Sequence, residues 1–338
     1  MRVLVTGANG HLGFNLVQGL LAAGHTVRGS VRSLSDESKT ARVRALGDVE
    51  LVQAELHRPD ELRAAMEGIE LLFHAAAVYS YAEPERDAEM LRAAIQGSEI
   101  ALRAAADARV RKIVLTSSIV TLPLTGRGEP PVDETSWTED FKVPYLRAKT
   151  EGERAAWRVA HERKLNLVTV LPGAITGPGF VRNTPSLDMI EAMMKGAFRM
   201  GVPNMNFPLV DVRDVVSAHL LAAERDCEGR FTACNDVLPT FEAMLQAMHA
   251  IDPRVPLPRM RLPDFVAPVL PYAERLNRLM LGTPITASPE LISTLKGKIF
   301  NASNRRIREV LGWQQTISME QTLRDTMAVF HARDRGYH

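Results

Sequence analysis

The 338-residue chain is poor in cysteine and has no excess of charge of either sign. Its two cysteines, Cys227 and Cys234, are spaced like neither a zinc knuckle nor a redox CxxC pair, and they give no disulfide framework. Its 41 basic and 40 acidic residues leave a net charge of +1, and no basic run exceeds two residues. This balance argues against nucleic acid or an anionic membrane surface as a partner. A small, neutral molecule is the partner that the composition favours.

Long hydrophobic runs are also missing. The short apolar run 3–5 is all that precedes the glycine-rich turn beginning at Gly7, which is far less than the apolar region of a signal peptide. The run 69–78 is interrupted by Glu70 and His74 and is shorter than the roughly 20 residues that a membrane-spanning helix needs. The sequence therefore predicts a cytoplasmic protein without a membrane segment.

Histidine is spread along the chain rather than clustered. The pair His161-Glu162 has no second histidine at the spacing of a zinc site, and the nine histidines form no group elsewhere. We therefore expect no metal site.

The first half of the chain alternates short β-branched runs with helical patterns, which is typical of βαβ units and a parallel sheet. Leu12, Leu16 and Leu20 recur every four residues before Gly24, and this spacing predicts the first helix. The predicted strands are 3–6, 26–31, 49–54, 71–75, 112–117 and 167–171, and further helices are predicted over 59–68, 86–108 and 144–164. The pattern predicts an α/β fold with a Rossmann-type, doubly wound parallel sheet.

The composition of the sequence changes after Pro172. Glycines and prolines punctuate residues 173–208, which are also rich in methionine, and a second proline-rich zone covers 253–271. The sequence therefore predicts two parts, a main domain and a smaller, mostly helical lobe. The main domain takes residues 1–172 together with 209–236, which return to its pattern, and the lobe takes 173–208 and 237–338.

The strongest local motif is the turn TGANGHLG at residues 6–13, which links the first predicted strand to the first predicted helix. Glycines there permit a tight turn and let the backbone approach a pyrophosphate, which binds where the free N–H groups of a helix N-terminus favour anions. The motif therefore predicts dinucleotide binding. The predicted contacts are Gly7, Asn9, Gly10, His11, Leu12 and Gly13.

Residues after the second and third predicted strands indicate which dinucleotide binds. An NAD enzyme of this type usually has an acidic residue after the second strand, where it binds the ribose hydroxyls of the adenosine. Here Arg28 and Arg32 occupy the region and Ser33 follows. A guanidinium offers charge and bidentate geometry to a 2′-phosphate, so NADP(H) is predicted, with Arg32 and Ser33 as contacts and Arg28 as the weaker candidate. Glu55 and Leu56, after the third strand, are placed to border the adenine.

Tyr145 and Lys149 are four residues apart and therefore share one face of the predicted helix 144–164. A lysine ammonium near a phenol favours the phenolate and lowers its pKa from about 10 toward the working range of a general acid or base. The tract Thr116-Ser117-Ser118 ends the fifth predicted strand, at the edge where open α/β sheets bind ligands. A hydroxyl there can donate a hydrogen bond to a substrate carbonyl and stabilise a developing oxyanion.

These motifs follow the order found in a known family. A TGxxGxxG turn, a TSS tract and a YxxxK helix resemble the extended short-chain dehydrogenase/reductase family, and the stretches TVRGSVR and DVRDVVSAHL resemble its dihydroflavonol 4-reductase-like carbonyl reductase branch. Further matching segments cover nearly the whole chain: HAAA at 74–77, LPG at 171–173, GP at 177–178, DVRDV at 211–215 and LGW at 311–313. One departure is Ala94, three residues before Gly97, where the family commonly has asparagine. It puts in doubt a proton relay at that position, and it weakens the parallel with sugar-nucleotide epimerases more than that with carbonyl reductases.

The resemblance implies a Ser-Tyr-Lys catalytic site in an NADP-binding Rossmann domain. Ser118 would orient a substrate carbonyl, with Ser117 as the fallback. Tyr145 would donate a proton, and Lys149 would tune Tyr145 and hold the nicotinamide ribose. The cofactor contacts that the resemblance implies are His74, Ala75, Ala76, Thr116, Tyr145, Lys149, Pro172, Gly173 and Ile175.

In this fold the lobe lines the substrate pocket, and flexible methionines suit an irregular apolar ligand. The candidate substrate contacts are Tyr79, Tyr81, Phe180, Met189, Met193 and Met205. For Tyr79, Tyr81 and Phe180, simple packing in a core is an equal alternative, and for the three methionines it is the more common one.

The motifs and the resemblance together predict NADPH-dependent reduction of a ketone or aldehyde on an apolar small molecule, with aromatic and polycyclic molecules among the candidates. Three alternatives stay open: a sugar-nucleotide epimerase with tightly held NAD, a 3β-hydroxysteroid-type dehydrogenase working in the oxidative direction, and a non-enzymatic NADP-binding sensor. The helix bearing Tyr145 often packs across a dimer in this superfamily, so a homodimer stays open beside a monomer.

Overall fold

A seven-stranded parallel sheet forms the centre of the computed structural model, which describes residues 1–76, 87–263 and 289–335. Its strand order is β11-β7-β5-β4-β1-β2-β3. The strands are β1 (Arg2–Thr6), β2 (Thr26–Val31), β3 (Val49–Gln53), β4 (Leu71–His74), β5 (Lys112–Thr116), β7 (Leu167–Pro172) and β11 (Gly229–Ala233). The predicted α/β fold is confirmed, and the six predicted strands match the observed ones to within one residue at each end.

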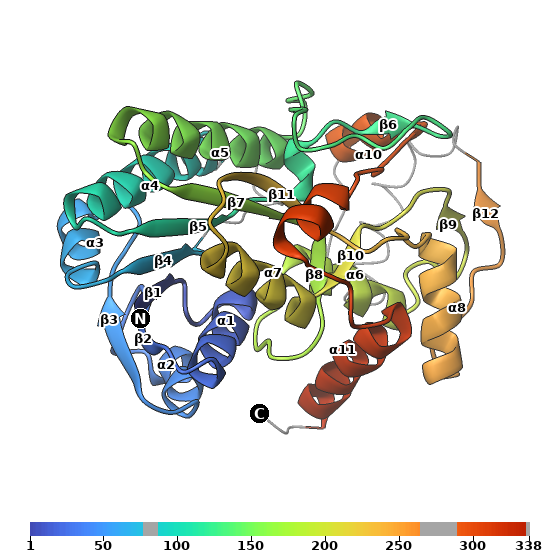
Figure 1. Ribbon diagram of the computed structural model, residues 1–338. Coiled ribbons are helices and arrows are strands. Elements are labelled where there is room, and N and C mark those ends of the chain that lie inside the picture. The colour runs from blue at the N-terminus through green and yellow to red at the C-terminus, as the bar shows by residue number, and fades with distance from the viewer. Residues whose placement is uncertain (77–86, 264–288, 336–338) are drawn as a thin grey trace.

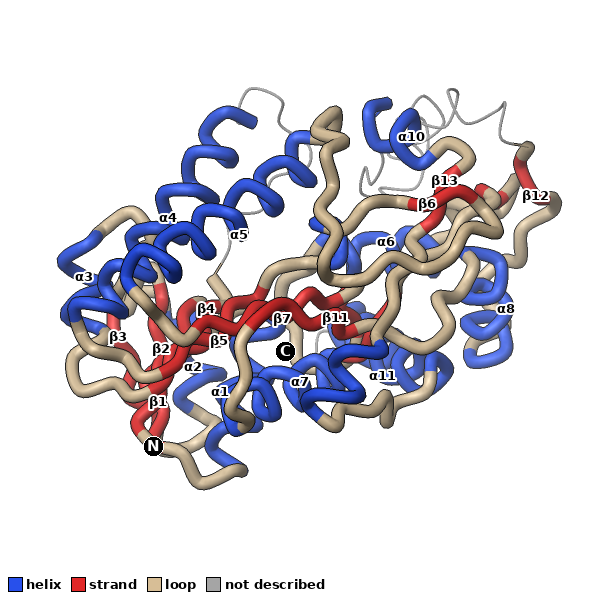
Figure 2. The backbone as a smooth tube through the Cα atoms, turned by 45° about the horizontal axis from the view of Figure 1, so that its top comes forward, coloured by secondary structure: helices blue, strands red, loops and turns tan. Residues whose placement is uncertain are grey.

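Helices cover both faces of this sheet (Figure 1). One face carries α1 (His11–Ala22), α2 (Glu37–Arg44) and α7 (Val212–Glu224), and the other carries α3 (Pro59–Ala65), α4 (Asp87–Asp107) and α5 (Pro144–Arg163). Strands β4 and β7 are buried along their whole length because both of their faces are covered, which explains their continuous apolar runs. Helices α4 and α5 run side by side along the sheet in both ribbon and tube views (Figure 2).

Beyond β7 the chain builds a second, smaller core. Methionine, phenylalanine and leucine side chains from α6 (Pro185–Met194), α8 (Phe241–Ile251) and α11 (Met319–Asp334) pack together there. Two-stranded pairs complete this region: β8 (Ala174–Thr176) with β10 (Leu209–Asp211), β9 (Val202–Pro203) with β12 (Arg261–Leu262), and β6 (Thr125–Gly126) with β13 (Lys298–Ile299). The remaining described elements are the 3-10 turn η2 (Ile119–Thr121), α10 (Pro289–Leu295) and the π-type turn η4 (Ile307–Leu311).

Near its C-terminal end the chain returns to the large sheet. Ile307, Leu311 and Trp313 are fully buried in the same cluster as α1 and α7, and the Trp313 indole Nε1 donates a hydrogen bond to the Asp214 carbonyl at 2.9 Å. Helix α11 then runs back into the smaller core. The division into a cofactor domain and a substrate lobe stays a prediction, but the segment 307–313 packs with the large sheet although it lies within the range given to the lobe.

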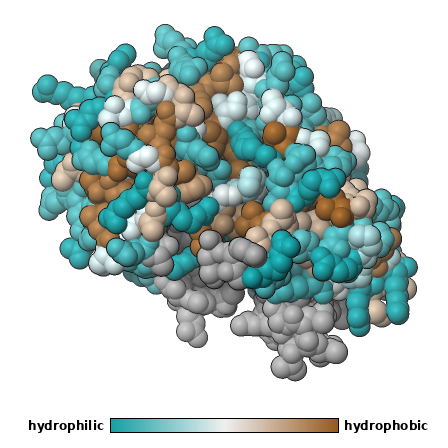
Figure 3. Space-filling model, turned by 90° about the horizontal axis from the view of Figure 1, so that it is seen from below, coloured by the Kyte–Doolittle hydropathy of each residue, from teal (hydrophilic) through white to brown (hydrophobic). Residues whose placement is uncertain are grey.

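The surface seen from below is mostly polar (Figure 3). Apolar side chains appear there in separate patches bordered by polar ones. Among the residues that the structure describes, no helix is both long enough and apolar enough to cross a membrane.

Candidate active site

The glycine-rich turn between β1 and α1 has a shape that only glycine permits. Gly7 has a φ of +69°, in the left-handed region, and a Cβ on it would lie 3.0 Å from the Cα of Ala76. A Cβ on Gly13 would lie 2.1 Å from the Gly7 carbonyl oxygen, so this residue must lack a side chain for α1 to start here. No side chain caps the N-terminus of α1 at Gly10, and its first-turn N–H groups have no acceptor within the helix. The turn therefore fits the pyrophosphate of a dinucleotide.

His74 ends β4, the strand next to β1, and contacts the residue that precedes the glycine-rich turn. Thr6 Oγ1 lies 3.0 Å from His74 Nδ1 and accepts a hydrogen bond from the Ala76 backbone N–H at 3.1 Å. Burial, together with the ammonium of nearby Lys149, lowers the pKa of His74 to about 4. His74 is therefore neutral at pH 7, and it faces the same space as Lys149.

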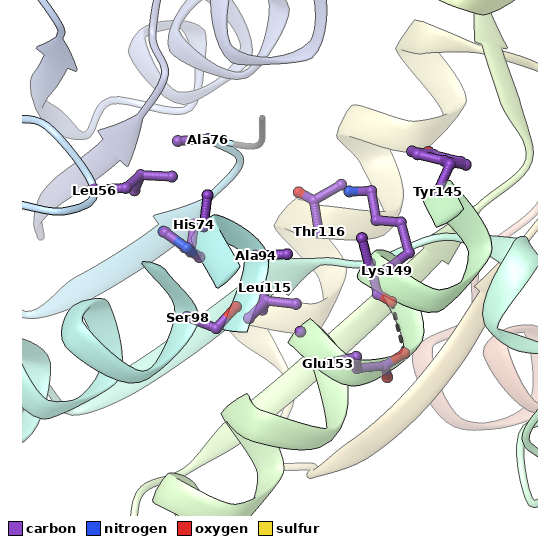
Figure 4. Close-up of a pocket in the computed structure, with 14 residues that line it drawn as sticks. Leu56, His74, Ala76, Ala94, Ser98, Leu115, Thr116, Tyr145, Lys149 and Glu153 are labelled. Carbon is purple, nitrogen blue, oxygen red and sulfur yellow. Dashed lines mark hydrogen bonds between the residues drawn. The ribbon is translucent and has the colours of Figure 1, made fainter. Parts of the chain in front are cut away.

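Tyr145 and Lys149 project from α5 into a pocket at the carboxyl edge of the sheet (Figure 4). Helix α5 begins at Pro144, where proline is favoured, and ends before Lys164, which has a left-handed φ of 53°. The predicted residues Leu56, His74, Ala76, Thr116, Tyr145 and Lys149 line this pocket together with Ala93, Ala94, Ser98, Leu115, Ser117, Ala148, Gly152 and Glu153. Ser98 and Glu153 were missed by the sequence reasoning, although Glu153 shares the helix face of Lys149 at a spacing of four residues.

The hydroxyls that follow one another at the end of β5 have different partners. The Nδ1 of His219 donates to the Val215 carbonyl at 2.8 Å, and burial lowers the pKa of His219 to about 4, so its Nε2 accepts from the Thr116 hydroxyl at 2.9 Å. The Ser117 hydroxyl donates to the Glu153 carboxylate at 2.6 Å.

Ser118 differs from both of these residues. Its Oγ accepts from the backbone N–H of Val120 at 3.3 Å and caps the turn η2. Within the described residues it has no acceptor for its own proton, so Ser118 can donate a hydrogen bond to a ligand where Thr116 and Ser117 cannot. Ser118 is only partly buried, but it lies outside the set of residues that line the pocket.

The adenosine side is marked by Arg32 and Ser33, directly after β2. The Arg32 side chain is exposed, and none of the described residues pairs with its guanidinium. Ser33 Oγ lies 2.9 Å from Ser35 Oγ. The guanidinium of Arg28, in contrast, lies 2.9 Å from the Glu50 carboxylate and donates to the Ala65 carbonyl at 2.8 Å. Arg28 is thereby committed to the fold, whereas Arg32 can bind a phosphate.

Glu55 and Leu56 follow β3. Glu55 Oε2 lies 3.0 Å from His57 Nε2, and the Glu55 backbone N–H donates to Glu61 Oε2 at 3.0 Å. Leu56 lines the pocket, on the side next to His74 and Ala76 (Figure 4).

The segment after β7 lies at the carboxyl edge of the sheet, next to the end of β11. Pro172 closes the strand, and Gly173 donates its N–H to the Ala233 carbonyl at 3.1 Å. Ile175 is partly buried against the core on the α1 side of the sheet. These three residues lie at the carboxyl edge of the sheet, as the sequence pattern implied, and their contacts to a nicotinamide stay a prediction.

Four of the residues predicted to contact substrate lie in the smaller core rather than in the pocket. Phe180 and Met193 are 4% and 0% exposed, and Met189 and Met205 pack against the same cluster. Phe180 meets the rings of His11 and Phe330 at centroid distances of 5.6 and 5.1 Å. Packing alone accounts for these four positions, and their role toward substrate stays a prediction.

The predicted residues Tyr79 and Tyr81 lie outside the described part of the chain. Across residues 1–76, 87–263 and 289–335, no three His, Cys, Asp or Glu side chains are grouped to hold a metal ion.

Comparison with known proteins places this geometry in a family. The model of the NAD dependent epimerase/dehydratase family matches residues 3–233. The chain belongs to this family. Within it, the chain is a member of the dihydroflavonol 4-reductase-like branch of the extended short-chain dehydrogenases/reductases, as its motifs indicated.

Similar proteins in this branch are reductases. Cinnamoyl-CoA reductase 1 of Arabidopsis thaliana is 33% identical over 269 residues, 76% of this chain and 76% of that protein. Tetraketide alpha-pyrone reductase 1 of the same plant is 30% identical over 292 residues, 82% of this chain and 86% of that protein. The crystal structure of gox2253 superposes with a TM-score of 0.83 at 27% identity and covers 99% of both chains. The enzyme is therefore an oxidoreductase, and these relatives support carbonyl reduction in general as its type of reaction.

Proposed function

We propose that this enzyme uses NADPH to reduce a ketone or aldehyde on an apolar small molecule, with aromatic and polycyclic carbonyl compounds as the first class to test. The observation that carries the proposal is the convergence of Tyr145, Lys149 and His74 in one pocket beside the glycine-rich turn. Residues 1–172 and 209–236 would hold the cofactor, and 173–208 with 237–338 would supply most of the substrate contacts.

The side chains at the pocket divide the work of carbonyl reduction. NADPH supplies the hydride when it is bound. Ser118 donates a hydrogen bond to the substrate carbonyl oxygen, which stabilises the negative charge that develops there. Tyr145 donates its phenolic proton to the same oxygen, and the ammonium of Lys149 stabilises the phenolate that remains. The glycine-rich turn holds the pyrophosphate, and Arg32 and Ser33 bind the 2′-phosphate.

The proposed reaction is tested by following oxidation of NADPH and of NADH by the purified protein. The panel contains aryl ketones, aldehydes, flavonoid-like ketones and steroids. Rapid NADPH loss with one class supports the proposal and names the class. NAD that co-purifies with the protein, without net consumption of added NADPH, would instead support an epimerase, and tight NADPH binding without any turnover would support a sensor.

Replacing Arg32 should change the choice of cofactor. We expect Arg32→Ala to raise the Kd for NADPH by about 10- to 100-fold, because a charge-assisted contact to the 2′-phosphate contributes about 1.5–3 kcal/mol. The Kd for NADH, which lacks that phosphate, should stay nearly unchanged, and fluorescence titration of each cofactor measures both values. Equal weakening of the two cofactors would contradict a role at the 2′-phosphate.

The two serines after Thr116 should differ in their effect on catalysis. We expect Ser118→Ala to lower kcat by about 10²- to 10³-fold, as loss of an oxyanion donor does, and Ser117→Ala to lower it by less than about 10-fold. Steady-state kinetics with the substrate identified above measures both variants, and Ser117→Ala is the matched control. The assignment is wrong if Ser117→Ala proves the more damaging of the two.

A further inference from the structure

A buried carboxylate that has no role in the chemistry above lines the pocket beside Ser117. Glu153 is four residues after Lys149 on α5, and its side chain is 1% exposed. It accepts hydrogen bonds from the Ser117 hydroxyl at 2.6 Å and from the Thr169 hydroxyl on β7 at 2.7 Å. The dashed line at Glu153 in Figure 4 marks the bond from Ser117. Glu153 thereby ties the helix of Tyr145 and Lys149 to the strand end that precedes Ser118.

The charge of Glu153 is balanced by an equally buried cation. Arg230, on β11, is 7% exposed and places its Nε 3.0 Å from Glu153 Oε1. Its other guanidinium nitrogens donate to the carbonyls of Glu134 and Ser136, each at 2.7 Å, and to the Thr121 hydroxyl at 2.8 Å.

The Arg230 guanidinium is also stacked. It lies 3.5 Å from the centroid of the Trp137 ring, and the indole Nε1 of Trp157 donates to Glu153 at 3.4 Å. All donors and acceptors of this ion pair are therefore used, which is the condition under which a buried pair is tolerated.

The contacts of the pair reach the turn that begins at Ser118 and the segment that precedes Tyr145. Thr121 closes the turn that Ser118 begins, and the backbone at 134–136 leads toward the start of α5 just before Tyr145. A buried ion pair contributes little net stability compared with apolar residues of the same volume, because both charges lose their hydration. What the pair provides here is a fixed geometry between two segments that are far apart in the sequence.

We propose that the Glu153–Arg230 pair is a positioning device for this active site. Glu153 accepts the hydrogen bond of the Ser117 hydroxyl, which keeps that hydroxyl from donating to the substrate carbonyl, and the pair fixes Ser118 relative to Tyr145. Neither residue donates to the substrate. The proposal rests on the carbonyl reduction proposed above, in which Ser118 and Tyr145 act on one oxygen.

A double-mutant cycle between Glu153→Gln and Ser118→Ala tests the positioning role. Glu153→Gln keeps the size of the side chain but removes its charge. We expect it to lower kcat by about 10²-fold, since a displacement of about 1 Å has that effect, with KM and the Kd for NADPH changed by less than about threefold. In the Glu153→Gln background, Ser118→Ala should lower kcat by a much smaller factor than in the parent enzyme, because Ser118 is already misplaced.

The matched control is Glu162→Gln on the same helix. Glu162 pairs with Arg103 on α4 through two bonds of 2.8 Å, but this pair is at the surface and far along the helix from the pocket. It should leave kcat unchanged. Strictly additive effects of Glu153→Gln and Ser118→Ala, or a kcat for Glu153→Gln equal to that of Glu162→Gln, would overturn the proposal.

A second variant separates positioning from folding. The double variant Glu153→Leu/Arg230→Met replaces the charges with apolar groups and should lose less stability than Glu153→Gln, because no charge is left buried alone. Its kcat should stay low. Recovery of kcat together with stability would reduce the pair to a structural role and overturn the proposal.

The same variants test the positioning role even if the parent protein reduces no compound in the panel. Hydrogen exchange of the backbone at 117–121 and 134–136 needs neither cofactor nor substrate. Glu153→Gln should accelerate exchange in both segments, whereas Glu162→Gln should not. Unchanged exchange would overturn the proposal independently of the reaction.

Discussion

Tyr145→Phe is expected to lower kcat for carbonyl reduction by about 10²- to 10⁴-fold, the range that a positioned general acid contributes. The change removes the phenolic proton and leaves the ring, which is 8% exposed and packs with Met90 and Leu146 in a small apolar cluster. Helix α5 should therefore keep its place, and Lys149 should remain able to hold the cofactor. Initial rates of NADPH oxidation at saturating substrate measure the loss.

Cofactor binding supplies the control for this experiment. Titration of Tyr145→Phe with NADPH should give a Kd within about threefold of the parent value, because the glycine-rich turn, Arg32 and Lys149 still supply the other cofactor contacts. A variant that binds NADPH normally and still turns over at the parent rate would exclude Tyr145 as the proton donor. A variant that loses both binding and unfolding cooperativity would show that the ring packing was disturbed.

The second large effect expected is a loss of stability in mild acid. Burial lowers the pKa of His11, His74 and His219 to about 4 in the folded protein, against an ordinary value of 6.5. Below about pH 6.5 these histidines bind protons in the unfolded chain but stay neutral in the folded chain, so the free energy of unfolding falls as the pH drops toward 4. At pH 5 each histidine accounts for about 2 kcal/mol, and the total is a large part of the 5–15 kcal/mol typical of a domain.

Urea unfolding at pH 7, 6 and 5 measures this dependence. His219→Gln removes one of the three groups and should make the slope of stability against pH shallower by about a third. A stability that is flat between pH 7 and 5 would contradict the neutral, buried state assigned to these histidines.

Local sequence signals were sufficient for six of the seven strands of the sheet and for the polar groups on single elements, whereas β11 was not predicted as a strand. β-branched runs placed these six strands to within one residue because all of them except β3 are largely buried, and the helix period placed Tyr145 and Lys149 on one side of α5. The glycine-rich turn was predictable because its glycines are required by local geometry: Gly7 has a left-handed φ, and Gly13 lies against the Gly7 carbonyl oxygen.

The parts that sequence reasoning missed depend on partners far along the chain. Glu153 and Arg230 are 77 residues apart, and each looks like an ordinary surface charge when the sequence is read locally. The methionines of α6 could not be assigned from the sequence, because an apolar helix face has the same residue pattern whether it packs in its own lobe or contacts a ligand. The structure places Met193 in the lobe core, where it is fully buried.

The return of the chain at Trp313 limits how this enzyme can be recombined. Residues 307–313 pack beside α1 and α7, while α11 immediately after them completes the smaller core. A lobe exchanged for that of a relative would have to be cut on both sides of this segment as well as near residues 172, 209 and 236. Chimeras joined at a single boundary would pack the relative's counterpart of Trp313 against the large sheet of this chain, so transfer of substrate preference between relatives calls for changes within the lobe and not for its wholesale replacement.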